Sequence, residues 1–320
     1  MKKLIFIMIT VAVGLTAACN KENDTDDTDN TDDKVAEITM TTAKEGLVRF
    51  YLSGTGTVII NWGDGTPNET TTFMDGVTQY YSHTYTISTI RTITIFGDNV
   101  TYLCCGHNPG DSGDIFNNQL TGLNVSKNAS LRYLECYNNQ LTTLDISKNT
   151  TLGILLCNNN QLTALDVSKN TAVAVLVCDN NRLTALDVSK NTALTALVCN
   201  NNQLTDLDVS KNTALTVLNC GNNLLTVLDV SKNTVLTQLA CDKNQLTALD
   251  FSKNTMLFFL GIDYNLFDAK RLDALFLTLH SNTVIHEGFI NKKTIYILNN
   301  PGTATCNPNI AEEKGWDVLN

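Results

Sequence analysis

The stretch CNNNQLTALDVSKNTAVAVLV, residues 157–177, decides the fold, because near-copies of it follow one another along the chain. The full unit reads L-x-x-L-x-C-x-x-N-x-L-T-x-L-D-V-S-K-N-T-x, and its cysteine returns every 21 residues. These cysteines are Cys136, Cys157, Cys178, Cys199, Cys220 and Cys241. An internal period of this length predicts a solenoid, in which each unit forms one coil that stacks on the next.

The first half of the unit resembles the signature of leucine-rich repeats, and the 21-residue length resembles that of internalin-like bacterial surface proteins. The resemblance extends from about residue 100 to the C-terminus. It implies a right-handed solenoid with a parallel β-sheet on the concave side. A coil this short leaves little room for a helix, so we expect short 3₁₀ or extended turns on the convex side.

About eight coils are expected over residues 100–267. The sixth position of the unit is filled by Ile115, the six cysteines and Ile262. VTYLCC, residues 100–105, reads as the first strand, followed by GHNPGDSGD as an inserted loop.

The cysteine column could be a metal site, a disulfide ladder or part of the core. Stacked strands lie about 4.8 Å apart, whereas a disulfide needs Cβ atoms about 3.5–4.5 Å apart with inclined bonds. Zinc needs four ligands that converge tetrahedrally, which a straight row does not offer. Because isoleucine replaces cysteine in the same register, we interpret the thiols as small apolar core residues.

Two further columns carry polar side chains. Asparagines recur from Asn118 to Asn265 at 21-residue steps, and we expect their amides to satisfy backbone groups inside the coils. Aspartates recur from Asp145 to Asp250, each followed three residues later by a lysine. The Asp and Ser of DVSKN are predicted to cap the outer turn. Calcium binding along the aspartate row is the alternative.

The residues beside the fourth and sixth positions project from the concave sheet and are not fixed by the core. In the middle of this surface they are apolar, with aromatic residues on either side. A contiguous apolar patch with aromatic anchors is typical of an interaction site. The predicted ligand-binding residues are Tyr133, Glu135, Tyr137, Ile154, Leu156, Val175, Val177, Val198, Val217, Phe259 and Tyr264. The alternative is ordinary strand chemistry on a face covered by the inserted loop, residues 106–114.

Residues 35–99 alternate in the manner of short strands separated by Gly, Asp and Asn turns, which predicts a β-sandwich. Within them Trp62-Gly63-Asp64-Gly65-Thr66 and then His83-Thr84-Tyr85 resemble the PKD-type (polycystic-kidney-disease) domain. Such domains act as spacers or weak interaction modules. His83 is expected to be a packed structural residue.

The N-terminus reads as a targeting segment. Lys2 and Lys3 precede an apolar run that ends in LTAAC, and this resembles a lipoprotein signal over residues 1–18 with Cys19 as the lipidated residue. An ordinary secretory signal is the alternative. Residues 19–34 are acidic and lack apolar side chains, so they are predicted to form a disordered tether. The chain is then expected to be exported and lipid-anchored to the bacterial outer membrane, at the cell surface.

After residue 267 the pattern changes, and residues 268–320 are predicted to form an α/β C-terminal cap with Asp268 as a helix N-cap. The whole chain is therefore predicted to be β-rich: an N-terminal β-sandwich, the leucine-rich-repeat solenoid and the cap.

A net charge of −10 argues against nucleic acid as a partner. The four histidines are scattered and no catalytic motif stands out, GDSGD being isolated from any protease pattern, so no enzyme, cofactor or metal is expected. We expect a recognition or adhesion protein that binds a protein or peptide ligand, for example a host extracellular protein, through the concave face. A structural or accessory surface lipoprotein, or a glycan-binding protein, is the alternative.

Overall fold

The computed structural model describes residues 37–74, 76–97, 99–106, 117–286 and 289–320. The predicted signal peptide, the acidic tether, Cys19 and Ile115 lie outside these ranges, as does all of the inserted loop except Gly106. No helix among the described residues is long and apolar enough to cross a membrane.

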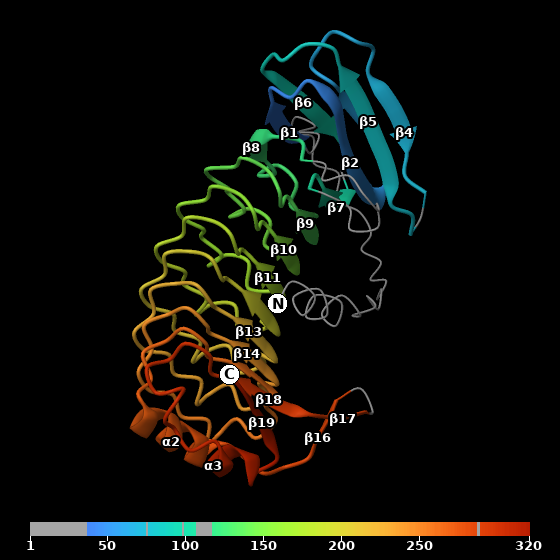
Figure 1. Cartoon of the computed structure of the whole chain (residues 1–320). Coiled ribbons are helices and arrows are strands. Elements are labelled where there is room, and N and C mark those ends of the chain that lie inside the picture. The colour runs from blue at the N-terminus through green and yellow to red at the C-terminus, as the bar shows by residue number, and fades with distance from the viewer. Residues whose placement is uncertain (1–36, 75, 98, 107–116, 287–288) are drawn as a thin grey trace.

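A β-solenoid with one short strand per 21-residue coil forms the body of the molecule. The strands are β9 (Tyr133–Glu135), β10 (Ile154–Leu156), β11 (Val175–Val177), β12 (Ala196–Val198), β13 (Val217–Asn219), β14 (Gln238–Ala240) and β15 (Phe259–Gly261). Each pairs in parallel with the next, and equivalent residues of neighbouring coils are aligned. Figure 1 shows these strands stacked along one side of a curved solenoid, with irregular turns on the other side.

The leucines and cysteines of the repeat fill the inside of the coils. Leu155, Cys157 and Leu162 are fully buried, and the equivalent residues of the neighbouring coils repeat the pattern. From Asn139 to Asn265, the residue before the conserved asparagine has a positive φ, such as 53° at Asn159. Asparagine tolerates this left-handed conformation better than most residues, which explains why the turn is rich in asparagine.

The N-terminal strands form two sheets that continue the solenoid. The strands are β1 (Glu37–Thr42), β2 (Gly46–Thr55), β3 (Thr57–Asn61), β4 (Glu69–Thr72), β5 (Gln79–Tyr85), β6 (Arg91–Phe96), β7 (Asn99–Cys104) and β8 (Leu120–Asn124). One sheet has the order β4-β3-β6-β1-β8; β5, β2 and β7 form one end of the twelve-stranded sheet that contains the solenoid strands. One apolar core runs from Ile38 to Trp316 through both regions.

Strand β7 belongs to both regions, because it is antiparallel to β2 and parallel to β9. Cys104 aligns with Glu135, which places Cys105 beside Cys136. The prediction that residues 100–105 form the first strand of the solenoid is confirmed by β7. The cysteine column of the described residues therefore begins at Cys105, whereas the count of sixth positions had begun it at Ile115, which lies outside the described ranges.

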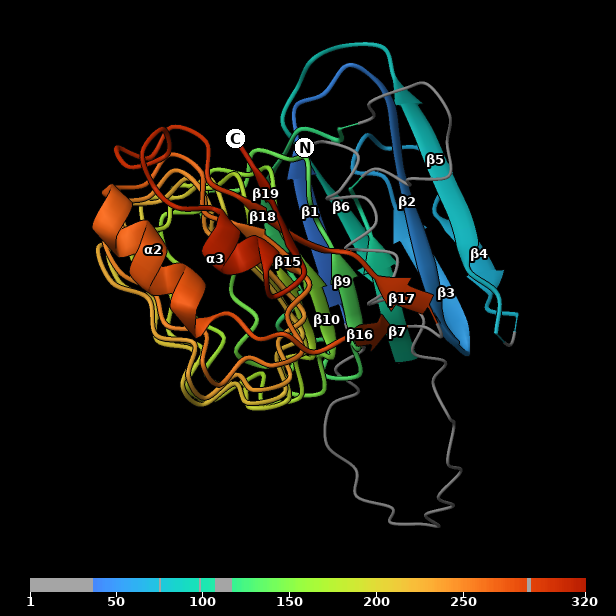
Figure 2. The ribbon, with the colours of Figure 1, turned by 60° about the horizontal axis from the view of Figure 1, so that its bottom comes forward.

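The C-terminal segment contains α2 (Ala269–Thr278), β16 (Val284–His286), β17 (Phe289–Asn291), β18 (Lys293–Tyr296), α3 (Asn309–Glu312) and β19 (Trp316–Leu319). The predicted helix N-cap is confirmed, since the Asp268 side chain accepts a hydrogen bond from Arg271 N at 2.8 Å. Strands β18 and β19 extend the parallel sheet. Figure 2 shows α2 and α3 on the side of the coils away from this sheet.

Candidate functional site

The two faces of the solenoid sheet bury different side chains. Within each three-residue strand the middle leucine points into the core, and its two neighbours point to the concave face, because side chains alternate along a strand. Two separate apolar clusters result: the leucine core on one side and, on the other, a cluster that we call the valine cluster. The valine cluster comprises Val175, Val177, Ala196, Val198 and Val217.

The prediction that the valines of the concave face are exposed to solvent is wrong. Val175 and Val177 are each 3% exposed, Val198 is 4% exposed and Val217 is 5% exposed. In-register pairing is part of the reason, because each side chain is flanked by its equivalents on the coils before and after it, Asn219 beside Val198 and Gln238 beside Val217 among them. The predicted residues Ile154, Leu156 and Phe259 are partly buried and pack against the same cluster.

All the apolar residues that pack on the valine cluster within the described ranges come from the concave face itself. The described part of the chain therefore supplies no second apolar layer. Ala196, which the prediction omitted, belongs to the cluster because it aligns with Val175 and Val217.

The end of the concave face nearest the N-terminal strands is polar and aromatic. Tyr102 of β7 donates a hydrogen bond from its hydroxyl to Glu135 Oε1 at 3.3 Å, and its ring centroid lies 6.4 Å from that of Tyr133. Burial raises the pKa of Glu135, and burial also raises the pKa of Tyr137. The predicted residues Tyr133 and Glu135 thus lie together, and the structure adds Tyr102 to them. The sequence analysis placed Tyr102 in the predicted first strand but did not include it among the ligand-binding residues.

Three aspartates stand further along the concave face, two positions after the end of their strands. Burial raises the pKa of Asp179 to about 6, and it also raises the pKa of Asp242 and of Asp263. Asp179 accepts a hydrogen bond from Asn180 Nδ2, and Asp263 Oδ1 accepts one from Leu298 N at 2.7 Å. Burial is the largest cause of the raised pKa of all three carboxylates, and Lys243 partly opposes it at Asp242.

At the other end of the face, the ring of Phe259 lies 5.7 Å from the ring of Tyr296, centroid to centroid. Tyr264 does not join this pair. It occupies the turn position with positive φ, is 43% exposed, and has Lys243 Nζ 5.7 Å from its ring centroid. Tyr264 thus lies beyond the sheet, and it is not part of the valine cluster.

The aspartate row on the outer turns has a local structural role. Asp166 Oδ1 accepts a hydrogen bond from Ser168 N at 2.8 Å, and the equivalent bond recurs from Asp145 to Asp250. Hydrogen bonds from Ser168 lower the pKa of Asp166. Among the described residues, no group of three or more His, Cys, Asp or Glu side chains could hold a metal ion.

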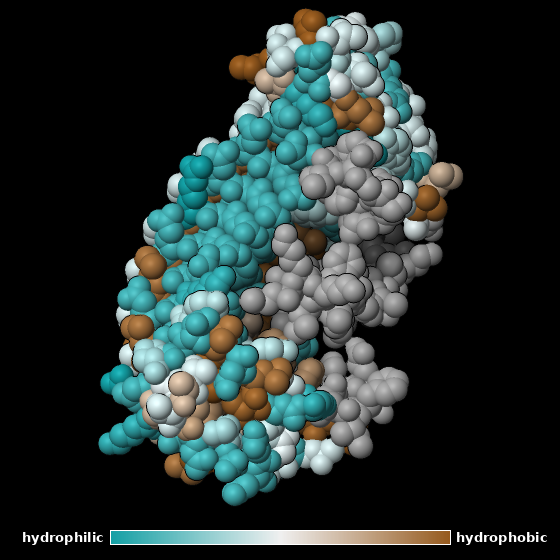
Figure 3. Space-filling view, viewed as in Figure 1, coloured by the Kyte–Doolittle hydropathy of each residue, from teal (hydrophilic) through white to brown (hydrophobic). Residues whose placement is uncertain are grey.

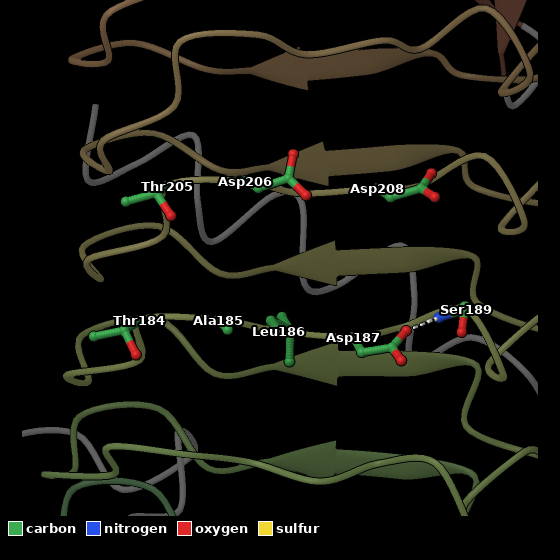
Figure 4. Close-up of a pocket in the computed structure, with 8 residues that line it drawn as sticks. All are labelled: Thr184, Ala185, Leu186, Asp187, Ser189, Thr205, Asp206 and Asp208. Atoms are coloured by element: carbon green, nitrogen blue, oxygen red, sulfur yellow. Dashed lines mark hydrogen bonds between the residues drawn. The ribbon is translucent and has the colours of Figure 1, made fainter.

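A cavity of about 260 Å³ lies on the flank of the solenoid between two successive coils. Figure 4 shows Thr184 and Asp187 on one coil and Thr205, Asp206 and Asp208 on the next. Asp187 is engaged with Ser189 N at 2.8 Å. The cavity is lined mainly by small and acidic side chains, and two of its three carboxylates, those of Asp187 and Asp208, belong to the repeated outer turns.

The cysteines of the repeat are free and buried, in agreement with their interpretation as core residues. Burial raises the pKa of Cys136 and of Cys220 to about 12. Since the thiolate is the reactive form, these thiols are poor nucleophiles and poor metal ligands at neutral pH.

The Trp62–Thr66 turn is packed together by its own residues. His83 Nε2 lies 2.7 Å from Asp64 Oδ2, and the His83 ring stacks on Trp62 with centroids 5.1 Å apart. Tyr85 donates a hydrogen bond from its hydroxyl to Trp62 O at 2.6 Å. These contacts agree with a structural role for His83.

No protein-family model matches the sequence, and no curated protein matches it. Solved structures that resemble the chain include two internalins of Listeria monocytogenes. One is the functional domain of InlJ, described as including a cysteine ladder, with 32% identity over 71% of this chain and 50% of that domain, at a TM-score of 0.47. The other is the internalin inlF of strain 4b F2365, with 21% identity over 61% of this chain and 75% of that one, at a TM-score of 0.41.

The leucine-rich effector protein YopM of Yersinia pestis is also similar, with 26% identity over 43% of this chain and 45% of that one, at a TM-score of 0.35. The chain spans about half the length of the InlJ domain that it matches. The solved structures that resemble the chain thus include leucine-rich-repeat proteins. This chain is itself a β-solenoid with coils of 21 residues.

Proposed function

We propose that this chain is a non-enzymatic recognition or adhesion protein that binds a protein or peptide through the concave face of its solenoid. The observation that carries the proposal is the valine cluster. It is a second apolar cluster, on the opposite side of the sheet from the core, and the described residues provide no layer to cover it.

The remaining surface supports the choice of this face. Figure 3 shows the flank of the solenoid as mainly hydrophilic, with hydrophobic residues towards the C-terminal end and over the N-terminal strands. Regular polar rows such as Asp166 and Lys169 cover the outer turns and are typical of a solvated surface.

We further propose that the chain is exported and held at the bacterial cell surface by lipid on Cys19. The acidic residues 19–34 then act as a tether, and residues 35–99 act as a PKD-like spacer that also closes one end of the solenoid. The end-closing role is supported by β7, which joins the N-terminal strands to the first coil.

A glycan-binding role is the second candidate. It is favoured by the aromatic pairs at the two ends of the concave face, Tyr102 with Tyr133 and Phe259 with Tyr296, because sugar rings stack on aromatic side chains. A structural or accessory role in a surface complex would use neither the valines nor the tyrosines.

The test is binding to arrays of purified extracellular proteins and of glycans. We expect V177D/V198D to abolish capture of a protein that the native chain binds, since each change places a charge in the valine cluster. V177T/V198T keeps the β-branched shape and should weaken capture less. V227D is the matched control, because Val227 is 69% exposed and lies outside the concave face.

Thermal melting must show that each variant folds. Unchanged capture by folded V177D/V198D would overturn the protein-binding proposal. Loss of a glycan signal in Tyr133→Ala, with capture by the valine variants intact, would favour the glycan alternative instead.

A further inference from the structure

The twelve-stranded sheet ends in β5 on its N-terminal side and in β19 on its C-terminal side (Figure 1). Strand β5 pairs with β2 along all seven of its residues, and no strand among the described residues pairs with its other edge. The backbone N–H and C=O groups of that edge therefore take no part in the ladders of the described sheets. An edge of this kind is a template for the addition of a further strand.

The other outer strands of the two large sheets have features that hinder pairing with another molecule. Strands β4 and β19 are four residues long and contain Glu69 and Asp317, and β8 pairs with β1 through an irregular register. Strand β5 has a regular register with β2, and residues 76–90 contain no Asp, Glu, Lys, Arg or Pro. Short length, charge, proline and irregularity are the usual means of protecting an edge, and β5 has none of them.

Exposed apolar side chains gather on β5 and just beyond its two ends. In the described part of residues 37–223, every large apolar side chain that is exposed lies within residues 74–90. These side chains are between 43% and 76% exposed, and they are Met74, Val77, Tyr80, Ile87 and Ile90. A concentration of this kind on an otherwise polar surface is typical of an interaction site.

The apolar side chains at the two ends are placed symmetrically about Ser82, the central residue of β5. Val77 and Ile87 are each five residues from Ser82, and Met74 and Ile90 are each eight residues from it. When two identical strands pair antiparallel about Ser82, residues at equal distances on opposite sides of it face one another. Val77 of each copy then faces Ile87 of the other.

We propose that β5 pairs antiparallel with β5 of a second copy of this chain, about a two-fold axis at Ser82. Main-chain hydrogen bonds along the strands and burial of the apolar side chains at both ends hold the pair together. An identical strand matches these ends by symmetry, whereas a strand of another sequence has no such reason to match them. This inference is independent of the proposed function of the concave face, because it uses neither the valine cluster nor the solenoid coils.

The first test is chemical cross-linking at Ser82, which is exposed and meets its own copy in the pair. The full chain, purified in mild detergent, carries Cys306→Ser so that the one partly exposed cysteine of the described residues is removed. Ser82→Cys is treated with a short thiol-to-thiol linker, and Ser281→Cys, at an exposed serine of the C-terminal segment, is the matched control. We expect at least about tenfold more linked dimer from Ser82→Cys, because pairing holds the two thiols at a high effective concentration.

The second test reads the register by charge, with cross-linking of Ser82→Cys as the measurement. V77K/I87K places lysine opposite lysine at both ends of the pair, and it should reduce the linked dimer to the level of the control. V77K/I87E substitutes the same two exposed positions but places lysine opposite glutamate, so it should keep the dimer. Thermal melting checks that each variant folds.

Linked dimer from Ser82→Cys that does not exceed that from Ser281→Cys would overturn the pairing, and a strand of another protein would then be the candidate occupant of this edge. A folded V77K/I87K chain that still links as well as its parent would also overturn it. Equal loss in V77K/I87K and V77K/I87E would refute the register centred on Ser82. Capture on the protein array should be unchanged in V77K/I87K, so failure of the pairing and failure of the proposed function are seen separately.

Discussion

Asn160 Nδ2 donates a hydrogen bond to the carbonyl oxygen of Cys136, 24 residues earlier and one coil away, at 3.0 Å. The same amide donates to Cys157 O at 3.1 Å, while Asn160 Oδ1 accepts from Leu141 N at 3.0 Å. One side chain thus joins its own turn to the preceding coil. The bond recurs in every coil from Asn139 to Asn265, so it holds the stack together as a ladder.

Replacing Asn160 should therefore destabilise the solenoid. We expect Asn160→Ala to lower the free energy of unfolding by about 2–4 kcal/mol, because buried backbone groups of two coils lose their partners. Urea denaturation followed by circular dichroism measures this. The exposed Thr163→Ala serves as control and should change stability by less than about 0.5 kcal/mol. A loss in Asn160→Ala as small as in the control would contradict the ladder.

In the cysteine column, a polar replacement should destabilise the fold more than an apolar replacement that merely removes the thiol. Cys220→Ala removes one heavy atom from the core, whereas Cys220→Ser buries a hydroxyl group without a partner. We expect Cys220→Ser to be less stable than Cys220→Ala by about 1–2 kcal/mol. Unfolding midpoints of the two variants decide this. Equal or reversed stabilities would argue against an apolar environment for the column.

Native thiol accessibility provides a second check on the column. Among the nine described cysteines, Cys306 alone is partly exposed, and the other eight are buried. A thiol reagent should modify Cys306 first and reach the remainder only after denaturation. Rapid modification of the native Cys306→Ser variant at Cys157 or Cys178, seen by peptide mass spectrometry, would contradict the buried ladder.

Asp179 should make stability depend on pH in a defined direction. Its pKa in the folded chain is about 6, above the ordinary value of 3.8, so the folded state binds its proton more tightly than the unfolded state. The stability that this group contributes is present at low pH and is lost as pH rises from about 4 to about 6. Asp179→Asn should therefore raise the free energy of unfolding at pH 7.5, by on the order of 2 kcal/mol, with little effect at pH 4.

Asp166→Asn is the control of opposite sign. Hydrogen bonds from Ser168 lower the pKa of Asp166, so its ionised form stabilises the fold and that contribution is lost as the pH falls. The variant should be less stable than the native chain at pH 7.5, and the difference should fade at low pH. Urea titrations at pH 4 and at pH 7.5 test both variants. If Asp179→Asn is less stable than the native chain at pH 7.5, the raised pKa of Asp179 is refuted.

Lipid attachment at Cys19 should place the chain in the membrane fraction. We expect the intact mass of the purified protein to exceed that of residues 19–320 by the mass of the attached lipid. Cys19→Ser should shift the protein to the soluble fraction, because serine has no thiol to carry the lipid. A native chain that is already soluble, with the mass of an unmodified polypeptide, would exclude the lipid anchor.

The sequence by itself determined the coil, because a 21-residue period with apolar residues at fixed positions can bury them only by stacking equal units. The cysteine environment and the structural role of the asparagine column followed from the same repetition. The tertiary structure alone decided where distant segments meet. Strand β7, which the sequence placed at the start of the solenoid, pairs with β2 of the N-terminal strands as well as with β9 of the next coil.

For the concave face, too, the sequence determined one part of the candidate site and the tertiary structure determined the rest. The sequence identified its columns, since side chains alternate along each strand, and Ile154, Leu156 and the valines do lie together. It could not reveal that Val175 and Val177 are almost wholly shielded, that Tyr102 reaches Glu135, or that Tyr264 lies in a turn beyond the sheet. Burial and long-range contacts depend on how separate segments come together in space, and a repeat read along the chain carries no record of that.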